Sequence, residues 1–146
     1  MDLKYRNKTI AISGGFDPIH VGHLRMFQHA KELVGENGQL IIILNDNEYL
    51  LRKKGRYFMT QSDRAELLGA LTCIDSVYQY TSDTDDVGDA LRTLKPDLFG
   101  NGGDVDNLSK IREYDVCREL GIEMVLGLGG DNGVHSSILF KKYYQD

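Results

Sequence analysis

The amino-acid sequence predicts an α/β fold, a doubly wound parallel sheet of five strands with helices on both faces. Short apolar runs alternate with longer stretches of helical periodicity, the pattern of strands joined by crossover helices. One run, residues 39–44, is apolar without interruption after its first residue, as in a parallel strand buried on both faces. Glycine-rich and polar segments follow the ends of the runs, and this is where such sheets bind ligands.

The elements are expected in regular alternation along the chain. The first helix is predicted at Val21–Val34, where an apolar stripe recurs at helical spacing. Residues 45–60 are expected to form a long polar loop. The sequence shows no repeat, linker or second domain. The strands are predicted at residues 9–13, 39–44, 74–80, 97–101 and 122–126, and the later helices at residues 61–71, 87–94, 108–120 and 136–144.

The bulk properties limit the function classes. The 146 residues carry a net charge of −5, which argues against a nucleic-acid-binding protein with its basic face. No apolar run approaches the roughly 20 residues of a membrane span, and the first residues lack the apolar stretch of a signal peptide. Two cysteines make no disulfide framework, and both are interpreted as packing residues. We therefore expect a cytoplasmic protein with no membrane partner.

The segment that joins the first strand to the first helix carries the strongest motif, GGFDPIHVGH over residues 14–23. A helix start presents unpaired N–H groups and the positive end of the helix dipole, so it favours phosphate. Gly14 and Gly15 allow a tight turn and a close approach of a ligand. His20 and His23 are three residues apart, so they share one side if the helix begins just after the first of them.

This segment resembles the G-x-F-D-x-x-H-x-G-H signature of the cytidylyltransferase-like nucleotidyltransferases, the family of glycerol-3-phosphate cytidylyltransferase and the heptose-phosphate nucleotidyltransferases. The resemblance covers roughly residues 9–144 and implies one Rossmann-like nucleotidyltransferase domain over residues 1–146. It implies that His20, His23 and Lys53 are catalytic. The nucleotide-binding residues that it implies are Gly14, Gly15, Phe16, Asp17, Gly22, Lys54, Arg64, Gly103, Asp104, Val134, Ser136 and Ser137.

Further segments match the family as well. The basic run of Lys53 and Lys54 resembles a lysine-bearing loop over the phosphates, or it is a solvated charge run. Arg64 matches an arginine at a helix start, although Ser62 replaces the usual glutamate. Gly103 and Asp104 follow a K-P-D sequence, and could equally form a capped glycine turn.

The last matching segment is a glycine followed by hydroxyl residues near the end of the chain. Ser136 and Ser137 match hydroxyls that bind the triphosphate in the family, or they serve only as a helix cap. His135 replaces a polar residue there. Gly130 replaces an arginine of the glycerol-phosphate enzymes, which puts the phosphate contacts and the substrate on this side in doubt.

The resemblance implies that an acceptor phosphate attacks the α-phosphate of a nucleoside triphosphate directly and that pyrophosphate leaves. Such a reaction needs positioning and positive charge, and paired histidines can donate to phosphate oxygens. Protonation of these histidines is expected to be coupled to nucleotide binding. Alternatively, they are structural caps, or His20, His23 and His29 form a zinc site, although no further ligand stands at a familiar spacing. His29 itself is interpreted as a helix-surface residue.

The resemblance also implies partners. We expect Mg²⁺ to bridge the triphosphate, with no metal held by the protein itself. CMP transfer from CTP is expected rather than AMP transfer from ATP, with a phosphorylated sugar or polyol as acceptor and a homodimer as assembly. Two alternatives are an adenylyltransferase of cofactor biosynthesis and a non-catalytic nucleotide-binding protein.

Overall fold

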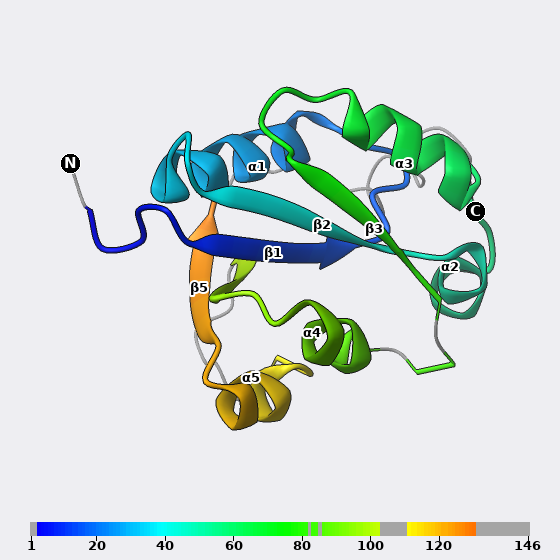
Figure 1. Cartoon of the computed structure of the whole chain (residues 1–146). Helices are drawn as coiled ribbons and strands as arrows, with labels where there is room; N and C mark the ends of the chain where they lie inside the picture. The colour runs from blue at the N-terminus through cyan, green and yellow to red at the C-terminus, as the bar shows by residue number, and fades with distance from the viewer. Residues whose placement is uncertain (1–2, 82, 85, 103–110, 131–146) are drawn as a thin grey trace.

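The computed structural model describes residues 3–81, 83–84, 86–102 and 111–130. All five strands in this part of the chain are parallel and form one sheet in the order β3-β2-β1-β4-β5 (Figure 1). The chain therefore winds outward from β1 twice, first through β2 and β3 and then through β4 and β5, which confirms the doubly wound α/β prediction. The strands are β1 (Thr9–Gly14), β2 (Gln39–Asn45), β3 (Ser76–Tyr80), β4 (Leu98–Gly102) and β5 (Glu123–Leu128).

The helices cover both faces of the sheet, with α1 and α3 on one side and α4 and α5 on the other (Figure 1). Along β2, Ile42 faces the first layer and Ile43 the second, because successive strand residues point to opposite faces. Both are fully buried, as the continuous apolar run predicts. The helices in the described part of the chain are α1 (Val21–Val34), α2 (Asn47–Lys54), α3 (Gln61–Gly69), α4 (Gly88–Leu94) and α5 (Tyr114–Leu120).

The predicted polar loop over residues 45–60 is wrong, because it contains the two-turn helix α2. Asp46 caps this helix by accepting from the Tyr49 N–H at 2.9 Å. Gly55 ends it in the left-handed conformation, with φ of 77°. These local start and stop signals outweigh the low apolar content of the segment.

Element boundaries differ from the prediction by a few residues. α3 ends at Gly69 rather than at residue 71, and β3 begins at Ser76 rather than at residue 74. Ile74 is nevertheless buried, so the apolar signal there reports packing before the strand begins. The predicted start of the helix at residue 108 and the last predicted helix, residues 136–144, lie outside the described residues.

The two cysteines pack inside the protein. Cys117 is buried in the core beneath α4 and α5, and Cys73 packs against the core on the other face. Burial raises the pKa of Cys117 to about 11, so its thiol is protonated at neutral pH. Among the residues that the structure describes, no helix is both long enough and apolar enough to span a bilayer.

Candidate functional site

His20 and His23 cap the start of α1 reciprocally. His20 is the N-cap residue, and its Nδ1 accepts from the Gly22 N–H at 3.1 Å. His23 Nδ1 accepts in turn from the His20 N–H at 3.2 Å. These bonds satisfy two of the N–H groups that a helix start leaves without partners. The interpretation of the histidines as caps is thus confirmed for their Nδ1 atoms.

The caps fix which side of each imidazole faces away from the backbone. The two rings stack with their centroids 3.7 Å apart and an interplanar angle of 20°. A ring nitrogen that accepts a hydrogen bond carries no proton, so in each neutral ring the proton belongs to Nε2. Both rings therefore have an Nε2–H donor as well as a capping Nδ1. Capping uses only Nδ1 and so leaves Nε2 as the second polar atom of each ring, although His20 Nε2 is buried in the structure.

Phe16 packs against His23 and Phe27 rather than lining an open surface. It is buried, and its ring meets the His23 ring edge-on with centroids 4.9 Å apart. A Cβ on Gly14 would lie 2.7 Å from Phe16 Cζ, and one on Gly15 would lie 2.6 Å from Leu50 Cδ2. A side chain at either position would therefore displace a neighbouring side chain of the protein itself, whereas the predicted close approach of a ligand stays a prediction.

Asp17 ties this junction to the segment before α3. Its side chain is buried, with 1% of the residue exposed. Its carboxylate accepts from the backbone N–H groups of Phe58 and Met59, the latter at 2.9 Å. A buried carboxylate is stabilised by such hydrogen bonds. Asp17 thus holds the histidine-bearing turn and residues 55–60 together.

Arg64 is fully buried at the start of α3. Its guanidinium donates to the carbonyl oxygens of Gly15 and Asn45, at 2.7 and 2.8 Å. It also donates to Met59 O at 2.9 Å and to Asn47 Oδ1 at 3.0 Å. Burial lowers the pKa of Arg64, while nearby Asp17 favours its charge. Most donors of this predicted nucleotide-binding residue are used to join the ends of β1 and β2 to α3.

The two lysines lie in the last turn of α2 rather than in a loop. Lys53 Nζ lies over the Tyr49 ring, 5.4 Å from its centroid, and the side chain is exposed. Lys54 is also exposed overall, but desolvation around its ammonium group lowers its pKa, against the opposing charge of Asp17. The turn therefore carries two positive charges beside the strand ends.

A cleft of about 200 Å³ opens at the carboxyl edge of the sheet. It lies between the ends of β1, β2 and β4, the topological switch point at which doubly wound sheets bind ligands. Gly14 belongs both to this cleft and to the histidine-bearing turn. The side chains with polar groups that line the cleft are Ser13, Asn45, Tyr49, Lys53, Asn101, Arg112 and Glu113.

Glu113 and Arg112 enter the cleft from the segment before α5, and no motif marks either residue in the sequence. Glu113 Oε2 accepts from the Val87 N–H at 3.1 Å, which joins the starts of α4 and α5. Burial raises the pKa of Glu113, and the bond from Val87 opposes this effect. Only the topology brings this acid to the ends of β1 and β2, so sequence reasoning could not find it.

The remaining predictions divide into two groups. Gly22 lies in the first turn of α1, where its N–H bonds to His20. His29 is exposed on the same helix, as predicted, and also accepts from the Gly129 N–H at 3.0 Å. The predicted residues that lie outside the described part of the chain are Gly103, Asp104, Val134, Ser136 and Ser137.

Together the fold and the site define a Rossmann-like nucleotidyltransferase, with a capped glycine turn and paired imidazoles beside the switch point of the sheet. The sequence profile of the family described as cytidylyltransferase-like matches residues 11–143. The chain belongs to this family.

Two kinds of relative share substantial identity with the chain. The bifunctional protein HldE of Syntrophotalea carbinolica is 38% identical over 103 residues, which cover 68% of this chain and 20% of that protein. The chain spans only about a fifth to a quarter of the HldE proteins that it matches. The FAD synthase of Thermococcus kodakarensis is 32% identical over 114 residues, which cover 77% of this chain and 74% of that protein.

A solved structure supports the fold. The lipopolysaccharide core biosynthesis protein from Thermoplasma volcanium superposes with a TM-score of 0.62 at 20% identity, over 82% of this chain and 93% of that one. A second, described as a putative nicotinate-nucleotide adenylyltransferase from Vibrio parahaemolyticus, has a TM-score of 0.56 at 13% identity, over 94% of this chain and 88% of that one.

Proposed function

We propose that the protein transfers a nucleoside monophosphate from a nucleoside triphosphate to a phosphorylated sugar or polyol. A phosphate oxygen of the acceptor forms a bond to the α-phosphorus, the bond from that phosphorus to the bridging oxygen breaks, and pyrophosphate leaves with the electron pair. The observation that carries this proposal is the stacked histidine pair, whose capping Nδ1 atoms leave Nε2–H as the donor of each neutral ring. Donors fixed in this way stabilise charge on a crowded phosphoryl transition state.

The other residues of the site have supporting roles in this proposal. Lys53 and Lys54 supply positive charge to the phosphates, as in other phosphoryl-transfer sites. The N-terminus of α1 offers backbone N–H groups to the same anion. Asp17 and Arg64 are positioning residues, because the protein itself takes up their polar groups.

Mg²⁺ enters the proposal with the triphosphate as part of the substrate. Within the described ranges, no three His, Cys, Asp or Glu side chains are grouped to hold a metal ion. The Asp17 carboxylate, which lies beside the histidines in sequence, already accepts two backbone N–H groups. The proposal assigns the ion no ligand from the described residues.

CTP is the proposed donor, as the sequence resemblance suggested. The similarity to FAD synthase favours a second candidate function, adenylyl transfer from ATP to a phosphorylated cofactor precursor. The HldE similarity leaves the base open, because the chain matches only part of those proteins. A homodimer in the cytoplasm completes the proposal, and light scattering of the purified chain tests its assembly.

Pyrophosphate release tests the proposed function. CTP and ATP, each with Mg²⁺, are assayed against a panel of sugar phosphates, polyol phosphates and FMN, with a reaction lacking acceptor as the control. We expect release with CTP and one sugar or polyol phosphate. Release with ATP and FMN alone would establish the second candidate instead. Nucleotide binding without release from any pair would favour a non-catalytic nucleotide-binding protein.

A further inference from the structure

The cleft between β1, β2 and β4 is too small for a whole nucleoside triphosphate. Its volume of about 200 Å³ lies below the roughly 300–1,000 Å³ of ordinary ligand pockets. A small phosphorylated sugar or polyol is the kind of ligand that suits a site of this size. Because Gly14 lines the cleft and also begins the histidine-bearing turn, a molecule held there lies beside the proposed nucleotide site.

The side chains of the cleft combine features that suit two parts of one ligand. Lys53 and Arg112 are cations from separate elements, which suits a phosphate group. Asn45 and Asn101 lie near the ends of β2 and β4, the strands on either side of β1, and offer amide groups to hydroxyls. The cleft therefore has the chemistry for a ligand with one anionic end and one hydroxylated end.

Glu113 is the acid of this cleft, and the protein fixes its orientation. Its carboxylate accepts from the Val87 N–H at 3.1 Å. A carboxylate has about four acceptor positions, so it retains capacity for ligand hydroxyls. A partly buried acid also repels a phosphate, which directs the anionic end of the ligand toward the two cations.

We propose that this cleft binds the acceptor of the transfer reaction, and that Glu113 determines specificity by accepting a hydrogen bond from an acceptor hydroxyl while Lys53 and Arg112 bind its phosphate. This inference rests on the proposed function for the identity of the ligand. It goes beyond that function because it assigns the choice of acceptor to a pair of residues, Arg112 and Glu113, outside every motif of the sequence.

Direct binding tests the proposal without turnover. Backbone amide NMR shifts of the full chain are followed during titration with ribose 5-phosphate, glycerol 3-phosphate and inorganic phosphate. We expect saturable shifts at Asn45, Asn101 and Glu113 with at least one of the two hydroxylated probes. Shifts confined to Gly22 and His23, or no response to any probe, would overturn the proposal. Pyrophosphate release is measured separately, so failure of the cleft and failure of the proposed function are distinguishable.

Two variants separate the roles of the cleft residues. Glu113→Gln keeps an oxygen for the Val87 N–H, and we expect it to raise the Kd of the better hydroxylated probe about tenfold while inorganic phosphate binds no more weakly. Arg112→Gln should weaken the binding of both the hydroxylated probe and inorganic phosphate. Asp89→Asn and Arg118→Gln, at exposed positions of α4 and α5, are the matched controls. Equal weakening of both probes by Glu113→Gln, or no weakening of either, would show that Glu113 does not read a hydroxyl.

Discussion

The histidine-bearing turn and the cleft beside it use polar residues in opposite ways. In the turn and the elements tied to it, Asp17 and Arg64 are buried and bonded to the backbone of the protein. In the cleft, Lys53 and Arg112 are exposed on separate elements. The comparison teaches that several of the most recognisable residues in the sequence build the site, whereas two of the residues that face the proposed acceptor, Arg112 and Glu113, carry no motif.

The largest effect is expected at Arg64. Arg64→Met removes four hydrogen bonds and leaves the carbonyl oxygens of Gly15 and Asn45 without their donor. We expect the free energy of unfolding to fall by about 3–5 kcal/mol, as when one partner of a buried charged network is removed. Urea unfolding measures the loss. Unchanged stability together with lost nucleotide binding would mean that Arg64 belongs to the ligand after all.

His23 is expected to show the opposite behaviour, with activity lost and the fold kept. In His23→Asn, the asparagine Oδ1 can replace His23 Nδ1 as the acceptor for the His20 N–H. The shorter asparagine side chain has no donor where the histidine has its Nε2–H. We expect turnover to fall about 10²-fold or more, as in other sites that lose a transition-state donor, with little change in Tm. His23→Ala should lose the cap as well, at a further cost of about 1 kcal/mol in stability.

Steady-state pyrophosphate release and thermal unfolding measure the two effects of these substitutions. Gln28→Ala, an exposed position on the same helix, is the control. Turnover near that of the unsubstituted protein in His23→Asn would assign His23 to capping alone.

A smaller effect is expected at the amino edge of the sheet, far along the strands from the site. Asp75 accepts from Lys31 Nζ and from the Leu40 N–H, both at 2.8 Å. Burial opposes its ionisation, but these two bonds outweigh burial and lower the pKa of Asp75. Because 37% of its side chain is exposed, Asp75→Asn should cost only about 1 kcal/mol at pH 7.

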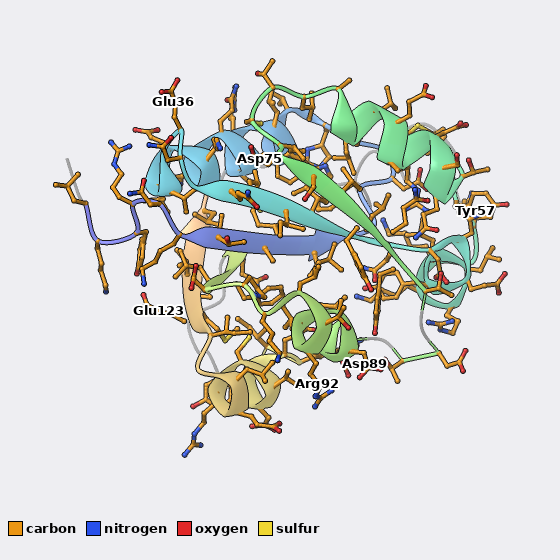
Figure 2. The ribbon with its side chains drawn as sticks, in the orientation of Figure 1. Glu36, Tyr57, Asp75, Asp89, Arg92 and Glu123 are labelled. Carbon is orange, nitrogen blue, oxygen red and sulfur yellow. The ribbon has the colours of Figure 1, made fainter. Side chains whose placement is uncertain are left out.

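The cost of Asp75→Asn should depend on pH. A lowered pKa contributes stability above the ordinary aspartate pKa of about 3.9, and this stability is lost as the pH falls through the lower pKa of the folded state. Thermal unfolding at pH 7 and at pH 3 should therefore show a difference between the two proteins that shrinks with acid. Glu36→Gln, at an exposed position near the end of α1, serves as the control (Figure 2). A difference that grew with acid would contradict this account.

The smallest effect is expected at the outer surface of α4. Arg92 and Asp89 form an ion pair of 3.1 Å there, and about half of the Arg92 side chain is exposed (Figure 2). Arg92→Met should change the free energy of unfolding by less than about 1 kcal/mol, because solvent screens such pairs. Set beside Arg64→Met in the same urea experiment, it measures how much of the Arg64 effect comes from burial.

The sequence predicts most of the fold because its signals agree with one another. The continuous apolar run of β2 and the amphipathic stripe of α1 each report burial that the structure contains. The signal fails at α2, where polar residues hide a helix defined by its caps, Asp46 and Gly55. Hydrophobic periodicity reveals a helix only when one side of the helix is buried. In α2 the buried residue is Leu50, which is too little apolar surface for a periodic pattern.

The site is predictable only where its residues are close together in the chain. His20, Gly22 and His23 lie within one helical turn, so their spacing alone predicts that they meet. Glu113 reaches the ends of β1 and β2 because β4 returns to β1, and no local pattern encodes that return. The functions of Phe16 and Asp17 as internal supports likewise depend on partners, Phe27 and Met59, that are distant in sequence.

The order of the strands also determines the order in which the parts of the protein can assemble. β1, β2 and β3 are neighbours both in the chain and in the sheet, and they emerge first during synthesis together with both capping histidines and Lys53. The other edge of β1 can pair only after β4 has been synthesised, because Ile10 pairs with Leu98. Asn101 and Glu113 are synthesised later still. In the proposed reaction, the histidine donors and Lys53 are thus synthesised before Glu113, the residue proposed to bind an acceptor hydroxyl.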